Sequence, residues 1–271
     1  VWELMKRSVL ISAHEEFVDT PSREKGGFLG DGAIVSTVAM PVHHERLLSQ
    51  RQLHEFIASK DQFWNTEANR GRINAVYPSN DGGRDIPDYT EAFLVWVWDY
   101  YMETGDLPFL REQYAQLKSV AEYVYRSRNA TTGLITDLPG GSGAYARGII
   151  DWPASMRYGY DMRTTGRAVI NHWAYADFDL MSRIADVTGN TGDRDLYRTR
   201  ANELKAAINA RLLNADGVYI DGIYADGKPS ANVSQHANMF PLALGLVPDA
   251  QRASVTAKVK ELQMRVGMVT V

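Results

Sequence analysis

The 271-residue sequence has no cysteine, which excludes disulfide bonds and metal sites built on thiolates. It also lacks a signal-peptide pattern and any apolar run of the roughly 20 residues that a membrane-spanning helix needs. The net charge of −4 lacks the positive excess typical of surfaces that bind nucleic acid or anionic membranes. We therefore expect a soluble protein without nucleic-acid or membrane partners. Its compartment stays open, with secreted and periplasmic locations among the alternatives.

Helical periodicity, by contrast, runs through most of the sequence. Apolar residues recur at intervals of three and four. They predict helices at residues 1–15, 30–39, 44–60, 88–104, 108–128, 165–189, 193–213, 234–244 and 248–265. Gly105 and Gly189 come where a left-handed residue closes the last turn of a helix. Asp106 and Asp193 then occupy the positions expected of N-cap residues.

The connections between these helices favour one all-α architecture over another. Residues 77–87 and 134–160 are long and rich in Gly, Pro and aromatic residues, and such segments inside a compact domain are usually functional. A helix bundle has shorter loops, so we predict a single all-α domain over residues 1–271, of the (α/α)6 toroid type. Six hairpins comprise about twelve helices, which predicts that the toroid is incomplete in this chain. The loops at residues 19–31, 77–89 and 134–160 are expected on one face.

The segment from Phe17 to Asp31 carries the strongest chemical signal. Asp19, Glu24 and Asp31 lie there with Arg23, in a stretch that contains one proline and three glycines. Glycoside hydrolysis needs one carboxylic acid to protonate the leaving oxygen and a second carboxylate to activate water or attack carbon. Neighbouring charges decide which carboxyl keeps its proton. From the residues alone, a capped helix entry with solvated acids explains this cluster equally well.

This segment resembles the motif of α-L-rhamnosidases of glycoside hydrolase family 78, which is Asp-x-Pro-x-Arg-(Asp)-Glu followed by Gly-Trp-x-Gly-Asp. The matching strings are Asp19-Thr20-Pro21-Ser22-Arg23-Glu24 and Gly27-Phe28-Leu29-Gly30-Asp31. The resemblance implies that Glu24 is the general acid and that Asp19, Arg23 and Asp31 bind sugar hydroxyls. Phe28 departs from the tryptophan of many members, which keeps a ring for stacking but loses the indole donor.

Other segments are similar to the same family. The string Tyr100-Tyr101 with Thr104-Gly105-Asp106 resembles a helix that ends in Tyr-Tyr-x-x-Thr-Gly-Asp, and Asp151-Trp152 resembles a loop that lines the sugar site. The resemblance therefore implies substrate contacts from Asp151 and Trp152, with loop packing as the alternative for Trp152. It implies a further contact from Tyr89, for which an ordinary position in the first turn of a helix is the alternative.

These resemblances imply hydrolysis of terminal α-L-rhamnose from glycosides by an inverting acid–base mechanism, without a metal or cofactor. Another toroid glycosidase of different sugar specificity and a non-catalytic carbohydrate-binding module stay open. In the resembling family the general base is a glutamate near the end of the toroid, and nothing in this sequence matches its surroundings. We therefore expect the base, the remaining helices and accessory β domains to belong to other parts of the same parent chain. If the base lies within residues 1–271, the candidates are Asp88, Glu91 and Asp151.

Overall fold

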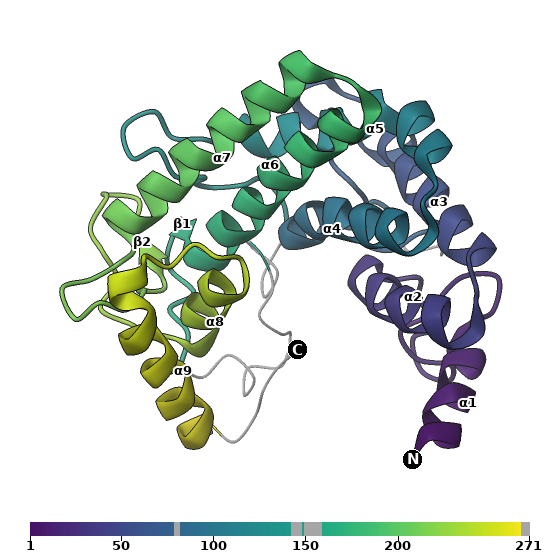
Figure 1. Ribbon diagram of the computed structural model, residues 1–271, viewed down its shortest axis with the longest axis horizontal. Coiled ribbons are helices and arrows are strands. Elements are labelled where there is room, and N and C mark those ends of the chain that lie inside the picture. The colour runs from purple at the N-terminus through teal and green to yellow at the C-terminus, as the bar shows by residue number, and fades with distance from the viewer. Residues whose placement is uncertain (79–81, 142–147, 149–158, 267–271) are drawn as a thin grey trace.

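Helical hairpins make up most of the chain (Figure 1). The computed structural model describes residues 1–78, 82–141, 148 and 159–266. The α-helices in these residues are α1 (Trp2–Ser12), α2 (Leu29–His43), α3 (Leu47–Phe63), α4 (Pro87–Thr104), α5 (Leu107–Tyr125), α6 (Ala168–Thr188), α7 (Thr191–Arg211), α8 (Gln235–Ala243) and α9 (Arg252–Val266). Two short 3-10 helices, η1 (Glu67–Asn69) and η4 (Asp249–Gln251), and two strands, β1 (Gly166–Arg167) and β2 (Gly222–Ile223), complete the described elements. The strands pair antiparallel, with Gly166 opposite Ile223.

The helices form a curved double row. Helices α2, α4, α6 and α8 contact one another in succession, and α3, α5, α7 and α9 pack on their outer side. The row is open on one side in Figure 1, where α1 and α9 stand at its two ends. The prediction of an all-α fold of the toroid type is confirmed. Each predicted helix is present, with ends that differ by a few residues, which is the usual uncertainty of helix boundaries.

Glycine and aspartate signals account for two of the helix junctions. Gly105 and Gly189 follow α4 and α6 with φ angles of 69° and 87°, in the left-handed region that was predicted for them. Asp106 caps α5 as predicted, because its carboxylate accepts a hydrogen bond from the Phe109 backbone N–H at 3.1 Å.

The same prediction is wrong for Asp193. The N-cap residue of α7 is Asn190, and Asp193 lies in the first turn of the helix. Its carboxylate accepts hydrogen bonds from Lys118 Nζ at 2.7 Å and from the Tyr114 hydroxyl at 2.8 Å, both on α5. A contact between two helices has therefore taken the place of the local cap.

The hydrophobic core fills the space between the inner and outer helices. Trp96, Phe93, Phe56, Phe178 and Tyr197 are each at most 1% exposed. Burying a side chain of this size contributes roughly 1.5–3 kcal/mol, so these contacts hold neighbouring hairpins together. Among the described residues, no helix has the length and apolar character needed to cross a membrane.

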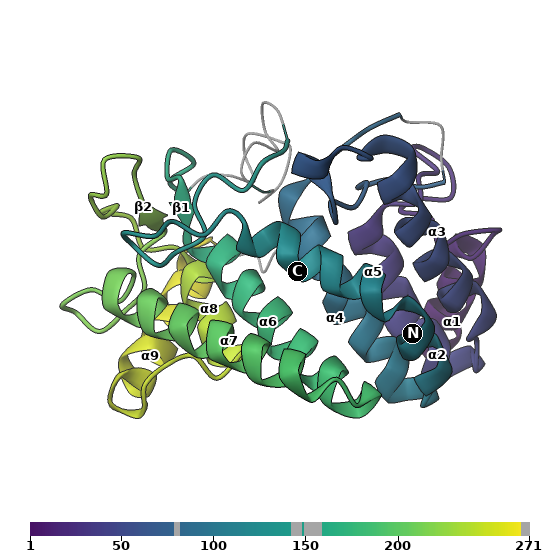
Figure 2. The same ribbon diagram turned by 90° about the horizontal axis from the view of Figure 1, so that it is seen from above.

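The long connections meet along one edge of the double row (Figure 2). Phe28 forms a β-bridge with Val76, and the backbone of Gly141 hydrogen-bonds the carboxylate of Asp85. The described parts of the loops at residues 19–31, 77–89 and 134–160 therefore lie together, as predicted.

Gly148, in the loop at residues 134–160, also lies against neighbouring segments. Its carbonyl accepts a hydrogen bond from Arg167 Nη1 at 3.0 Å, and a Cβ placed on Gly148 would lie 3.5 Å from Asp88 Oδ1. Gly148 therefore lies close to Asp88 in the first turn of α4 and to Arg167, which precedes α6. Asp151 and Trp152 lie outside the described residues.

Candidate active site

The connection between α1 and α2 folds back on itself around Asp19. The Asp19 N–H donates to the Gly26 carbonyl at 3.0 Å, and the Gly26 N–H donates to Asp19 Oδ1 at 2.9 Å. The Thr20 hydroxyl donates to Asp19 Oδ2 at 3.3 Å and accepts the Glu24 N–H at 3.1 Å. These four hydrogen bonds bring Asp19 and Glu24 side by side in a tight turn.

The pKa values of the Asp19 and Glu24 carboxyls are shifted in opposite directions. The hydrogen bond that the Glu24 carboxyl donates to Asp19 raises the pKa of Glu24, with smaller contributions from burial and from the negative charges of Asp19 and Asp31. Arg23 acts in the other direction, since its Nη1 lies 2.8 Å from Glu24 Oε1. Burial acts to raise the pKa of Asp19, but hydrogen bonds from Glu24, Gly26 and Thr20 outweigh it and lower the pKa. Glu24 therefore keeps its proton to a higher pH than Asp19 does.

Asp31 and two aromatic rings lie beside this turn. Asp31 is in the first turn of α2, where burial and the charge of Asp19 raise its pKa. Phe28 precedes α2 and packs with Tyr89 on the small apolar cluster of Ala75, Val76 and Ile86. The Tyr89 ring also covers Gly30, where an added Cβ would lie 2.9 Å from Tyr89 Cζ. The predicted residues Asp19, Arg23, Glu24, Phe28, Asp31 and Tyr89 are thus brought together.

Some residues of this site received no role from the sequence. Thr20 and Gly26 supply hydrogen bonds that set the Asp19–Glu24 geometry. Thr20 falls within the matched motif, and a threonine just before a proline turn is a signal for side-chain-to-backbone hydrogen bonding. Glu91, one of the alternative candidates for the base, is fully buried in α4. Its carboxyl has no exposed surface from which to meet a substrate in this structure, which disfavours Glu91 as the base.

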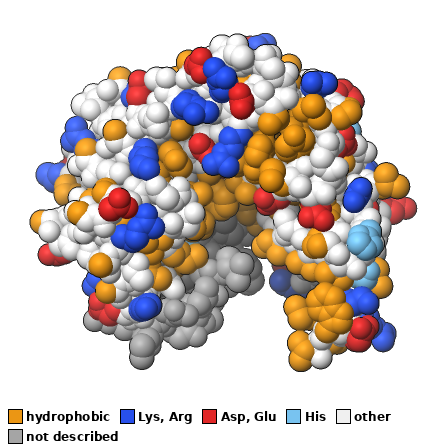
Figure 3. All heavy atoms as spheres, in the orientation of Figure 1, with side chains coloured by type: hydrophobic (Ala, Val, Ile, Leu, Met, Phe, Trp, Pro, Cys, Tyr) orange, Lys and Arg blue, Asp and Glu red, His pale blue; other side chains and the backbone are white. Residues whose placement is uncertain are grey.

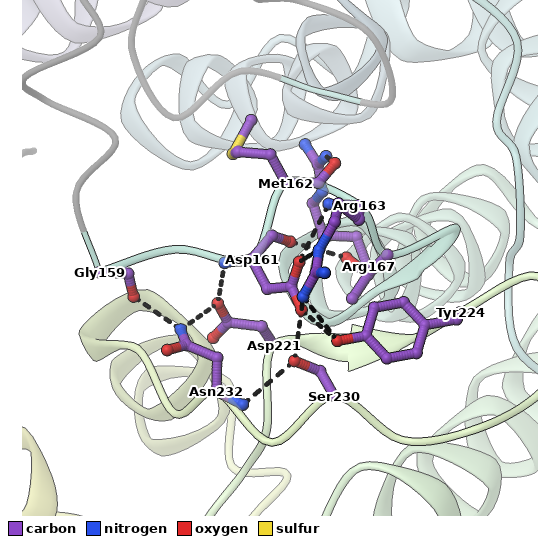
Figure 4. Close-up of polar contacts among 10 residues, drawn as sticks. Gly159, Asp161, Met162, Arg163, Arg167, Asp221, Tyr224, Ser230 and Asn232 are labelled. Carbon is purple, nitrogen blue, oxygen red and sulfur yellow. Dashed lines mark hydrogen bonds and ion pairs between the residues drawn. The ribbon is translucent and has the colours of Figure 1, made fainter.

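A second polar cluster surrounds Asp161, next to the β1–β2 pair (Figure 4). The Asp161 side chain is 6% exposed. Its carboxylate accepts hydrogen bonds from Arg163 Nε at 2.9 Å, from Ser230 Oγ at 2.8 Å and from the Tyr224 hydroxyl. The Asp161 N–H in turn donates to Asp221 Oδ2 at 2.7 Å.

These contacts give Asp161 a structural role. A cleft of about 570 Å³ opens beside it, lined by Tyr160, Arg163, Tyr224 and Asn232 among others. Because several donors of the chain itself already bind both oxygens of Asp161, this carboxylate anchors the segment that leads into α6 instead of offering a ligand group to the cleft.

Replacing Asp161 with asparagine should lower the melting temperature. Hydrogen bonds from Arg163, Tyr224 and Ser230 lower the pKa of Asp161 well below its usual range. Hydrogen bonds to a charged group are worth about 1.5–3 kcal/mol, so we expect a loss of roughly 4–8 °C at pH 7. Scanning calorimetry of the 271-residue chain is the measurement.

The pH dependence of the melting temperature provides a control for Asp161→Asn. A carboxyl with a lowered pKa stabilises the fold above its unfolded pKa, and the effect is lost as the pH falls through the folded pKa. The difference between the two proteins should therefore shrink below about pH 4. Asp226→Asn removes an exposed carboxylate that pairs with Lys228 in the same region and should change little. A difference in melting temperature that stays constant at all pH values would contradict the structural role of the Asp161 carboxylate.

The curved row of hairpins, with paired carboxyls in a loop on one face, defines the class of six-hairpin glycosidase domains. The family model of the bacterial α-L-rhamnosidase six-hairpin glycosidase domain matches residues 1–269, and the chain belongs to this family. No curated protein sequence matches the chain.

Solved structures show the same fold. The crystal structure of a family 78 rhamnosidase from Bacillus sp. GL1 has a TM-score of 0.78 and 22% identity, and the match covers 94% of this chain and 25% of that one. A rhamnosidase from Klebsiella oxytoca with rhamnose bound has a TM-score of 0.71 and 20% identity, over 94% of this chain and 46% of that one. A family 105 glycoside hydrolase from C. acetobutylicum has a TM-score of 0.54 and 10% identity, and the match covers 97% of this chain and 71% of that one. The chain thus spans a quarter to a half of the two rhamnosidases.

Proposed function

We propose that the protein containing this chain hydrolyses terminal α-L-rhamnosides, with Glu24 as the general acid. The observation that carries the proposal is the Asp19–Glu24 pair, in which a hydrogen bond raises the pKa of one carboxyl and lowers that of the other. Neighbouring carboxyls with displaced pKa values are the usual way to keep an acid protonated near neutral pH. The family of the chain supports the choice of rhamnose, as does the neighbour that was solved with rhamnose bound.

In the proposed reaction Glu24 gives its proton to the glycosidic oxygen as the bond to the anomeric carbon breaks. A water molecule attacks that carbon from the opposite face, which inverts its configuration. Asp19, Arg23 and Asp31 bind hydroxyls of the sugar, and the rings of Phe28 and Tyr89 offer apolar surface beside them. Asp151 and Trp152 belong to the proposed site by their resemblance to the family's sugar-lining loop.

Asp19 is not the partner that activates the water. The two carboxyls of an inverting glycosidase lie about 6.5–9.5 Å apart, and those of a retaining one about 5–5.5 Å apart. Asp19 and Glu24 are in hydrogen-bond contact, which is closer than either arrangement. In this proposal Asp31 already binds hydroxyls of the sugar, as its match to the family motif implies. We therefore place the general base on another part of the parent chain.

We further propose that residues 1–271 form most of one catalytic domain, and that other helices of the parent chain close the ring. The open end of the double row carries exposed apolar side chains on α1 (Figure 3). Trp2, Leu4, Met5 and Leu10 are between 55% and 69% exposed. Contiguous apolar surface of this kind usually marks an interface. The six hairpins of the family and the greater length of the two rhamnosidases support this reading, and that length leaves room for accessory β domains.

A panel of aryl glycosides tests the proposal. We expect the full-length parent to release the aglycone from an α-L-rhamnoside, and the 271-residue chain alone to turn over nothing because it lacks the base. Hydrolysis of a different glycoside by the parent would support another toroid glycosidase. Sugar binding without hydrolysis of any glycoside would support a non-catalytic module. Full activity of the isolated chain would place the base within it, with Asp88 and Asp151 as the next residues to replace.

A further inference from the structure

The Thr20 hydroxyl lies between the two carboxyl-bearing residues of the candidate site. It donates to Asp19 Oδ2 at 3.3 Å and accepts the backbone N–H of Glu24 at 3.1 Å. We infer that Thr20 is a positioning residue, whose hydroxyl ties the Glu24 backbone to the Asp19 carboxylate and so keeps the two carboxyls in contact. The effect of Thr20 on catalysis rests on the proposed function, whereas its effect on the pKa values of Asp19 and Glu24 does not.

The geometry explains why a hydroxyl is required at this position. Only a group that both donates and accepts can bridge a carboxylate oxygen and a backbone N–H. The bridge spans the turn at residues 21–24, which Lys25 ends in a left-handed conformation with φ 56°. A lysine in that conformation is held by its surroundings at some cost. The Thr20 and Gly26 contacts to Asp19 lie on either side of Lys25 and hold the turn closed.

Thr20 thereby decides between two competing partners of Glu24. Asp19 contacts the Glu24 carboxyl and favours its protonated form, whereas Arg23 lies 2.8 Å away and favours the ionised form. Arg23 is 65% exposed and its long side chain can follow Glu24 outward. If the bridge is removed, the Glu24 backbone is no longer fixed relative to Asp19. The Glu24 carboxyl can then pair with Arg23 alone, which is the arrangement that releases the proton.

Titration by NMR of the side-chain carboxyls in the 271-residue chain tests this inference directly. In Thr20→Val we expect the pKa of Glu24 to fall and that of Asp19 to rise. Each shift should be roughly half to one pH unit, which is the size of one lost hydrogen bond. Thr20→Ser keeps the hydroxyl and should restore both values. If Thr20 had a purely structural role, the pKa values of Glu24 and Asp19 would not shift in opposite directions in Thr20→Val and return to their wild-type values in Thr20→Ser.

A matched control removes a different hydroxyl near the site. Thr37 donates to the Ile34 carbonyl at 2.8 Å within α2, and Thr37→Val should leave both titrations unchanged. If Thr20→Val disturbs the turn, Thr20→Ala provides the same comparison with Thr20→Ser. Titrations of Thr20→Val that match the wild type, or a serine variant that behaves like the valine variant, would overturn the inference. An absence of rhamnoside hydrolysis in the aryl glycoside panel would reject the proposed function and leave this result standing.

Discussion

Replacing Glu24 with glutamine should slow the parent enzyme by about 10²–10⁴-fold on rhamnosides with poor leaving groups, which is the usual contribution of general acid catalysis. Glutamine keeps the size of the side chain but has no proton to give. Activated aryl rhamnosides need little protonation of the leaving oxygen, so their hydrolysis should be slowed far less. The measurement is kcat/KM for a matched pair of substrates. Equal losses on both substrates would contradict the role of Glu24.

A control variant and a pH profile sharpen this test. Glu15→Gln removes an exposed carboxylate from the same α1–α2 connection and should leave the activity unchanged. Because Asp19 raises the pKa of Glu24, Asp19→Asn should lower it. The alkaline limb of the pH–rate profile reports loss of the acid's proton, and it should therefore move to lower pH in Asp19→Asn. An unmoved alkaline limb would show that Asp19 does not control the proton of Glu24.

Replacing Glu91 with glutamine should make the domain more stable at pH 7. Glu91 on α4 and Asp177 on α6 are both 0% exposed, and among the residues that the structure describes the carboxyl oxygens of both have no hydrogen-bond partner. Burial raises the pKa of both carboxyls well above the ordinary value, and the charges of Asp177 and Asp88 raise that of Glu91 further. A raised pKa costs the fold free energy at pH 7, where the same carboxyl is ionised in the unfolded chain. Glutamine avoids that cost, so the melting temperature should rise by roughly 5–10 °C.

The same pair makes the stability of the wild type depend on pH. A carboxyl with a raised pKa contributes stability that is present below its unfolded pKa, near 4.5 for Glu91, and is lost as the pH rises through the folded pKa. The wild type should therefore be less stable at pH 8 than at pH 5. Glu91→Gln and Asp177→Asn should each flatten that slope, which calorimetry across this range measures. Glu103→Gln, an exposed position on α4, is the control. A destabilised Glu91→Gln would show that the ionised carboxylate has a partner.

The helices of this protein could be predicted because their signals are local. Gly105 and Asp106 end one helix and begin the next through contacts with residues at most four positions away. The proximity of the predicted site residues was also foreseeable, since Asp19 to Asp31 form one continuous segment. Asp193 shows the limit of this reasoning. Its sequence position indicates an N-cap, but Lys118 and Tyr114 lie more than seventy residues earlier in the chain and bind it instead.

The helices, the turns between them and the position of the carboxylate-bearing loop follow from the sequence, because neighbouring residues specify backbone conformation. The direction in which each carboxyl pKa is shifted follows only from the folded structure. Hydrogen bonds within one loop shift the pKa values of Glu24 and Asp19 in opposite directions, whereas burial and then the charge of Asp177 on α6 raise the pKa of Glu91. Burial and nearby charges set a pKa, and for Glu91 both arise only when α6, which is distant in the sequence, packs against α4.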